Sequence, residues 1–222
     1  MSDLFHTDRV TVAVVTGQHP FEVPGFHHCF RSLPGIDYYP QHMEDYVADV
    51  AHARQQYDVV LFYNFHQQTP DPNAGPAQAA MRQALEELGE TNQGIVVLHH
   101  ALLAFPGWQL WTDIMGIPDR RFGFYHDERV YTEIADPNHP ITQGLSPWEM
   151  VDETYTMDDA GEGSHILLTT NHPRSMHTLA WTRQYRNARV FCYEGGHDNQ
   201  TFTNPNFRTV LGRGILWAAG RL

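Results

Sequence analysis

The chain of 222 residues contains no lysine, and all fourteen of its basic residues are arginine. Without a lysine amine the protein cannot form a Schiff base with a carbonyl substrate, anchor pyridoxal phosphate or supply the lysine of a Walker A loop. Acidic residues outnumber the arginines, so the formal net charge is −12. Because nucleic-acid binding relies on basic contacts to phosphate, we expect no nucleic-acid partner and favour a neutral small molecule.

Cysteine is also scarce, with Cys29 and Cys192 as the two examples. A single pair does not make a disulfide framework, and neither residue has a second cysteine at metal-ligand spacing. Cys192 lies in the apolar, strand-like run 190–193, and Cys29 lies in a segment that is expected to be helical. We therefore predict two buried, inert thiols.

Long apolar runs are absent as well. No run approaches the roughly 18 residues that a membrane-spanning helix needs, and residues 1–6 lack the basic and apolar regions of a signal peptide. Hydrophobic residues make up 41% and charged residues 18% of the chain, an ordinary balance for a globular protein. These observations predict one domain over residues 1–222, a cytoplasmic location and no membrane partner. They leave open whether the chain forms a homo-oligomer.

What the sequence does contain is a regular alternation of β-branched runs and helical patterns. Strands are predicted at 9–17, 36–40, 57–63, 95–98 and 188–193, and helices around 26–33, at 43–56, 77–88 and 108–115, and from 205 onward. Such alternation makes a doubly wound, mostly parallel α/β sheet with right-handed crossovers. In the second half, alternating segments at 124–135, 148–157 and 165–170 predict additional, partly antiparallel strands.

Histidines follow several of the predicted parallel strands. His99 and His100 end the run that begins at Gly94, and His197 follows two glycines after the last strand. The carboxyl ends of parallel strands meet at one edge of a sheet, where ligands bind in this architecture. We therefore expect functional roles for His99 and His197, and Gly196 would let the backbone approach a ligand closely.

Carboxylates come from the segment 148–155. Adjacent strand residues face opposite sides, so one of Asp152 and Glu153 should point into the pocket. A carboxylate beside an imidazole can orient it or act as its acid/base partner. Together with two histidines it can instead bind a divalent metal such as Zn²⁺, which takes three protein ligands at catalytic sites. The ligands would then be His99, Glu153 and His197, although no HExxH spacing supports this alternative.

Aromatic residues lie near these positions in the sequence and can stack on the C–H faces of a sugar. The predicted substrate-binding residues are His19, Asn64, Phe65, His100, Trp108, Tyr155, Trp181 and Gly196. The sequence has no G-x-G-x-x-G after a strand and no G-x-S-x-G elbow, so it does not indicate dinucleotide binding or serine-hydrolase chemistry.

Several motifs, in order along nearly the whole chain, resemble the ThuA-like (trehalose utilisation) family within the class I glutamine amidotransferase-like, flavodoxin-type superfamily. The matching segments are 14–19, 94–99, 136–145, 152–155, 177–181, 196–197, 207–208 and 214–220. The resemblance implies a flavodoxin-like fold and adds His177 to the candidate substrate-binding residues. In the amidotransferase relatives a cysteine stands at a sharp elbow after the central strand. Here His99 takes that place, so we do not expect a cysteine glutaminase.

The family's association with disaccharide catabolism, including keto-sugars made by oxidation of glycosides, implies a carbohydrate substrate. We expect a lyase, isomerase or hydrolase in which His99 is the general base or acid. His197 would be a second acid/base or an oxyanion donor, and Glu153 the orienting carboxylate. This chemistry requires no cofactor. Two alternatives stay open, namely a non-catalytic sugar-binding or regulatory module and a metal-dependent hydrolase.

Overall fold

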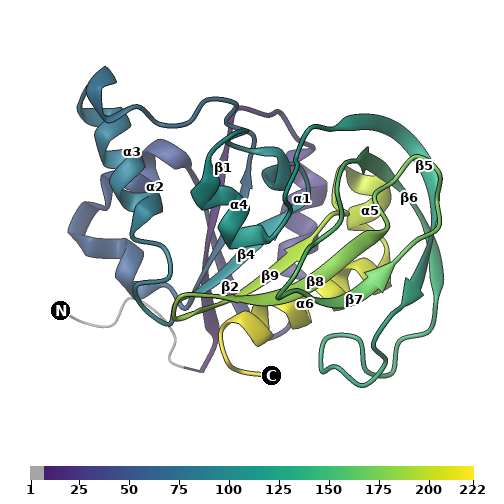
Figure 1. Ribbon diagram of the computed structural model, residues 1–222. Helices are drawn as coiled ribbons and strands as arrows, with labels where there is room; N and C mark the ends of the chain where they lie inside the picture. Colours follow the sequence, from purple (N-terminus) through teal and green to yellow (C-terminus); the bar gives the residue numbers. More distant parts are fainter. Residues whose placement is uncertain (1–7) are drawn as a thin grey trace.

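The computed structural model describes residues 8–222, and these residues form a mixed sheet of nine strands (Figure 1). The strands are β1 (Val10–Gly17), β2 (Ile36–His42), β3 (Val59–Asn64), β4 (Gly94–Leu98), β5 (Gly123–Ile134), β6 (Trp148–Thr156), β7 (His165–Thr169), β8 (Thr178–Tyr185) and β9 (Ala188–Tyr193). Their order across the sheet is β2-β1-β3-β4-β9-β8-β7-β5-β6. Neighbours are parallel from β2 to β9 and antiparallel from β9 to β6. The predicted fold class, parallel first and antiparallel later, is confirmed.

Helices cover both faces of the parallel half. They are α1 (Val23–Arg31), α2 (Met43–Ala48), α3 (Pro76–Glu86), α4 (Gln109–Met115), α5 (Asn199–Phe202) and α6 (Pro205–Ala218), with short 3-10 helices η1 (Val50–Gln56), η2 (Pro72–Ala74) and η3 (His99–Leu103). Strands β3 and β4 are buried along their whole length. This burial explains their continuous apolar sequences, because a central parallel strand has no polar face.

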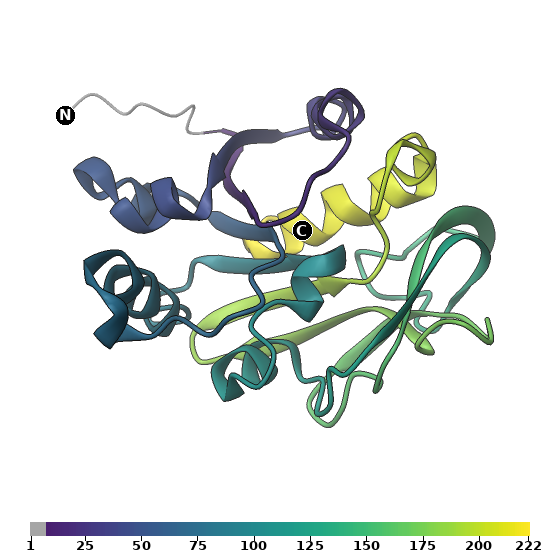
Figure 2. The same cartoon turned by 90° about the horizontal axis from the view of Figure 1, so that it is seen from above.

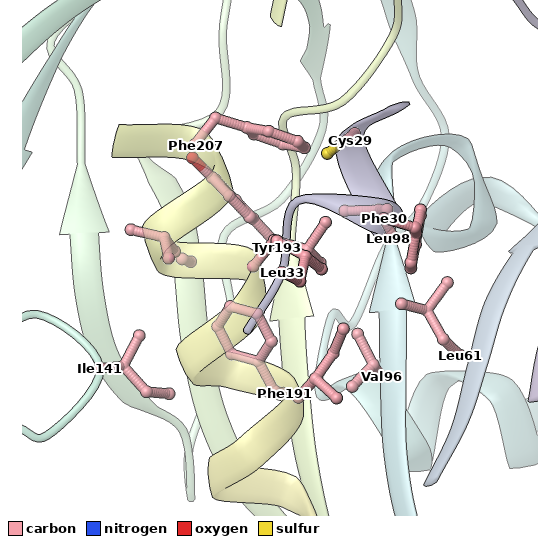
Figure 3. Packing of buried hydrophobic residues seen from close by; sticks show 14 of the residues in the cluster. Cys29, Phe30, Leu33, Leu61, Val96, Leu98, Ile141, Phe191, Tyr193 and Phe207 are labelled. Atoms are coloured by element: carbon pink, nitrogen blue, oxygen red, sulfur yellow. The ribbon is translucent and has the colours of Figure 1, made fainter. Parts of the chain in front are cut away.

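Helices lie on both sides of the sheet (Figure 2), and the core accordingly has two layers, one on each side. Val12 and Val14 of β1 pack with α1 and α6 on one side. Ala13 and Val15 face the other side, where α2, α3 and α4 pack, as the alternation of side chains along a strand requires. Figure 3 shows the first layer, in which Phe207 of α6 lies close to strand side chains.

Three local features differ from the predictions. The helix expected over 43–56 is interrupted, because Asp49, Ala51 and His52 have positive φ values of 48°, 59° and 56°. Strand β8 was not predicted, since its sequence mixes apolar and polar residues without a clear alternation. The four-residue helix α5 was also not predicted, because it is too short to show helical periodicity.

The start of α6 follows the prediction. Asn204 caps the helix with its side-chain oxygen, which accepts hydrogen bonds from the backbone N–H groups of Asn206 and Phe207. Pro205 occupies the first turn, where a backbone N–H has no partner within the helix. The cap therefore determines where this long helix begins, and it lies two residues after the end of α5 at Phe202.

Within residues 8–222 no helix has the length and apolarity needed to cross a bilayer. The prediction about a signal peptide concerns residues 1–6, which lie outside the described part of the chain. Cys29 and Cys192 are both buried, as predicted. Burial raises the pKa of Cys29 to about 12 and raises that of Cys192 as well.

Both cysteines should therefore be unreactive in the folded protein. We expect an aromatic disulfide reagent to leave native protein unlabelled at neutral pH and to label two thiols per chain after denaturation, because only the exposed thiolate is nucleophilic. The release of the chromophore measures this directly. Rapid labelling of either cysteine in the native protein would contradict the burial seen here.

Two glycines of α6 provide a matched test of the packing. A Cβ on Gly214 would lie 2.1 Å from the Phe191 ring, whereas a Cβ on Gly212 would meet Leu33 at an ordinary 3.4 Å. We expect Gly214→Ala to lower the free energy of unfolding by about 1–3 kcal/mol through overpacking. Gly212→Ala should leave it unchanged or raise it by up to about 1 kcal/mol, because alanine favours the helix. Urea denaturation compares the two variants, and equal stabilities would contradict this packing.

Candidate active site

His99 stands at a sharp turn where β4 passes into η3. Its backbone φ is 53°, in the left-handed region, and its side chain is fully buried. Non-glycine residues in this region are uncommon and are concentrated at functional sites, and histidine is among those that tolerate it best. The turn therefore has the elbow character that the resemblance implied.

His197 reaches His99 because β4 and β9 are adjacent parallel strands, with Leu98 opposite Tyr193. Just beyond these residues, Nδ1 of His99 donates a hydrogen bond to the carbonyl oxygen of Glu194 at 2.7 Å. A carbonyl oxygen can only accept, so Nδ1 carries the hydrogen and Nε2 faces the opposite way. That Nε2 lies 3.2 Å from Nδ1 of His197.

Strand β6 brings Glu153 and Tyr155 to the same point. These two residues are two apart and so share one face of the strand. The Tyr155 hydroxyl donates to Oε1 of Glu153 at 2.7 Å and lies 2.8 Å from Nε2 of His99. Oε1 of Glu153 is 3.5 Å from Nε2 of His99 and 3.5 Å from Nδ1 of His197. We call His99, Glu153, Tyr155 and His197 the His99 cluster.

Asp152 also faces this region, which corrects the expectation that one carboxylate alone would do so. Its two oxygens accept hydrogen bonds from the backbone N–H groups of Gly196 at 2.8 Å and His197 at 3.0 Å. Both Asp152 and Glu153 line a hollow of about 120 Å³ beside His197.

The positive charge of protonated His99 and the negative charge of Glu153 stabilise each other inside the cluster. Burial favours neutral His99, but the hydrogen bond to Glu153 and the charges of Asp152 and Glu153 outweigh it and raise the pKa of His99. Burial acts on Glu153 in the same sense, yet its contacts with His99 and Tyr155 lower the pKa of Glu153 to about 2. Since the Tyr155 hydroxyl has one hydrogen, donated to Glu153, its oxygen accepts from Nε2–H when His99 is protonated.

The pKa of Glu194 is shifted in the opposite direction from that of Glu153. Burial and the nearby charge of Asp152 raise the pKa of Glu194 to about 8. Its carboxyl oxygen accepts a hydrogen bond from the backbone N–H of Tyr155 at 2.9 Å. Burial likewise raises the pKa of Asp152. Glu194 thus links β9 to β6 as a largely uncharged group at neutral pH.

His126 is a member of the site that the sequence analysis missed. Its Nδ1 lies 2.7 Å from Oε2 of Glu153, and its ring borders the hollow. An irregularity in the pairing of β5 with β6 separates Tyr125 from Glu128, and Asp127 within it has a φ of 55°. This bulge re-aims the strand next to the site, as bulges commonly do. Nothing in the sequence indicated it.

A second group of predicted residues lies beside the cluster. The His19 ring is 4.3 Å from the His100 ring and 6.3 Å from the His197 ring, and Phe65 contacts both His19 and His100. Asn64 is buried at the end of β3, and its carbonyl oxygen accepts a hydrogen bond from Nδ1 of His100 at 3.4 Å. The structure therefore brings these residues together around the carboxyl ends of the parallel strands.

Three other predicted substrate-binding residues lie elsewhere. Trp181 is fully buried in the layer beneath α4, and its indole N–H donates to the carbonyl oxygen of Met115 at 2.8 Å. Trp108 belongs to the same buried layer. His177 is exposed, and its Nδ1 donates to the carbonyl oxygen of Thr170 at 2.7 Å. Large aromatic side chains are more often core than ligand-binding, which accounts for both tryptophans.

The cluster also has donors suitable for a cation. In the described part of the chain, His99, Glu153 and His197 each offer one ligand atom, and these three atoms lie within 4.8 Å of one another. These are the three residues that the sequence analysis named as ligands for the alternative with a bound metal. Two imidazoles and a carboxylate match the donor types of catalytic zinc sites.

Solved structures similar to this chain share its architecture. They include a ThuA-like protein from Parabacteroides merdae, with a TM-score of 0.73 and 21% identity over 95% of this chain and 90% of that one. A cytoplasmic protein from Salmonella typhimurium has a TM-score of 0.61 and 13% identity over 93% and 99% of the two chains. A glutamine amidotransferase from Thermotoga maritima has a TM-score of 0.53 and 9% identity over 96% and 99%. At these identities the similarity establishes the fold alone.

Sequence comparison is more specific about the family. Among curated proteins, no match to this sequence was found. Residues 43–218 match the family described as ThuA, trehalose utilisation. This match spans well over half of the chain and contains all four members of the His99 cluster. The chain belongs to the ThuA family, whose description is trehalose utilisation.

Proposed function

We propose that this protein is a cytoplasmic enzyme that acts on a disaccharide or keto-glycoside by histidine acid/base chemistry at the His99 cluster. The observation that carries the proposal is the convergence of His99, Glu153 and His197 within 3.5 Å from three separate segments of the chain. A buried imidazole in a left-handed turn, held by a fixed hydrogen bond, is costly to maintain without a role. Strained and charge-paired groups of this kind are concentrated at reaction centres.

His99 is the residue that we assign to proton transfer. Its Nδ1–H is held by Glu194, so Nε2 is the atom that accepts a proton from the substrate or returns it. A carbonyl in a keto-sugar acidifies the neighbouring C–H bond, and removal of that proton is the first step common to elimination and isomerisation. Glu153 stabilises the imidazolium that forms, and His197 lies close enough to act as a second acid/base group.

Recognition of sugar hydroxyls is supported by two buried acceptors near the cluster. In the described part of the chain, Nε2 of His100 and Oδ1 of Asn64 have no hydrogen-bond partner. Nδ1 of His100 donates to the backbone, so its Nε2 carries a lone pair, and burial together with neighbouring histidines keeps the pKa of His100 far below its usual value. An unpaired buried acceptor is costly, and a sugar hydroxyl would supply the missing donor once a side-chain shift opens either atom to the ligand.

His99→Asn is the sharpest test of the proton-transfer role, because asparagine tolerates the left-handed conformation and so preserves the turn. Turnover should be measured on a panel of disaccharides and their keto derivatives, with product analysis. We expect kcat/KM of the variant to fall at least about 100-fold, the usual contribution of a general acid or base.

A matched control is His28→Gln, which replaces an exposed histidine on α1 and should retain full activity. Circular dichroism verifies that both variants are folded. Unchanged turnover in folded His99→Asn would refute the assignment of His99. Calorimetric binding of these sugars without any conversion would instead support a non-catalytic sugar-binding module.

A further inference from the structure

Three ligand atoms of the His99 cluster form a nearly regular triangle. Nε2 of His99 and Nδ1 of His197 are 3.2 Å apart, and Oε1 of Glu153 is 3.5 Å from each nitrogen. Nitrogen and oxygen ligands lie roughly 2.0–2.1 Å from a tetrahedral zinc ion, which separates any two of them by about 3.3 Å. The triangle therefore has the size of one face of a tetrahedral metal site.

We propose that His99, Glu153 and His197 bind one divalent cation of the zinc type through these three atoms. The inference rests on the proposed function in treating the cluster as the reaction centre, and it names the cation that this centre takes. Two imidazoles with one carboxylate leave a fourth position for water or substrate, as catalytic rather than structural zinc sites do.

Further hydrogen bonds and ion pairs hold the three proposed metal ligands in place. The hydrogen bond from Nδ1 of His99 to the carbonyl oxygen of Glu194 leaves the Nε2 lone pair facing the triangle. The second oxygen of Glu153 is held by His126 at 2.7 Å. Asp152 accepts from the backbone N–H of His197 and so positions the loop that carries this ligand. Partners of this kind orient metal ligands and set their affinity.

The fourth coordination position, which none of the three proposed ligands fills, can be reached from solvent. The His197 side chain is 24% exposed, while that of His99 is fully buried, so the triangle has one closed and one open side. The open side adjoins the hollow of about 120 Å³ lined by Glu153, His197 and His126. A hollow of this kind needs about 10–15 Å³ to hold one water. The hollow therefore has room for a metal-bound water and part of a substrate.

Cation binding would change the roles of the imidazoles without moving the reaction centre. His99 and His197 would donate lone pairs to the ion, which polarises a sugar carbonyl or hydroxyl as a Lewis acid. The Tyr155 hydroxyl, 2.7 Å from Oε1 of Glu153, would then be the proton-bearing group beside the ion. Binding of the cation and turnover of a sugar must therefore be measured separately.

The test is a titration of chelator-treated, full-length protein with Co²⁺ and Zn²⁺. We expect one ion per chain at micromolar or lower concentration by calorimetry, and with Co²⁺ the strong visible absorption of a four-coordinate site. Glu153→Gln and His197→Gln each remove one ligand and should weaken binding more than about 100-fold, beyond the effect of losing an outer contact. His28→Gln should bind like the unchanged protein.

Two results would overturn the site. One is the absence of stoichiometric binding by the unchanged protein, and the other is equal affinity in folded Glu153→Gln, His197→Gln and His28→Gln. If the ligand variants do not fold, anomalous scattering at the zinc edge from crystals of the unchanged protein decides the matter, because the peak must lie between the three named atoms.

The outcomes also separate this inference from the proposed function. Stoichiometric metal binding without turnover of any sugar supports the site and counts against the enzyme assignment. Full turnover by chelator-treated protein that binds no ion supports the acid/base enzyme and rules out the metal site.

Discussion

A hydrogen bond of 2.7 Å from Nδ1 of His99 to the carbonyl oxygen of Glu194 joins the ends of two neighbouring parallel strands. Because a carbonyl oxygen can only accept, this bond determines which nitrogen of His99 carries the hydrogen and which faces the cluster. It also holds the loop after β9 next to β4, so His197 arrives beside His99. The proton-transfer role and the cation site both depend on the orientation that this bond imposes.

Buried negative charge is the second constraint on the site. Asp152, Glu153 and Glu194 all lie in the interior near one another. Charges so close cannot all be maintained without compensation. Glu153 is compensated by three imidazoles and a tyrosine hydroxyl, and Asp152 by two backbone N–H groups, while burial and the charge of Asp152 raise the pKa of Glu194 to about 8 and favour its uncharged form. The differing environments give three similar carboxyl groups three different roles.

The strands of the parallel half were predictable because burial on two faces leaves a distinct apolar pattern, whereas the helix expected over 43–56 is broken at Asp49. The apolar run that ends in His99 is an example of such a strand. The cap at Asn204 was predictable for a related reason, because it also depends only on residues adjacent in sequence. The elements that were not predicted depend on contacts with residues that are distant in the sequence. Strand β8 is stabilised by pairing with β7 and β9, and the site position of His126 follows from a bulge that its own sequence does not mark.

Sequence alone determined the α/β class, the burial of the two cysteines and the absence of lysine chemistry, and it predicted His99, Glu153 and His197 as site residues. These features follow from local periodicity, residue type and sequence motifs, none of which requires interatomic distances to be known. The tertiary structure decided that Tyr155 stands between His99 and Glu153, that His126 holds the far oxygen of Glu153, and that Trp108 and Trp181 belong to the core. The physical reason is that spacing along a chain says which residues share a face, whereas the separation of atoms from β4, β6 and β9 is set by how the whole sheet packs.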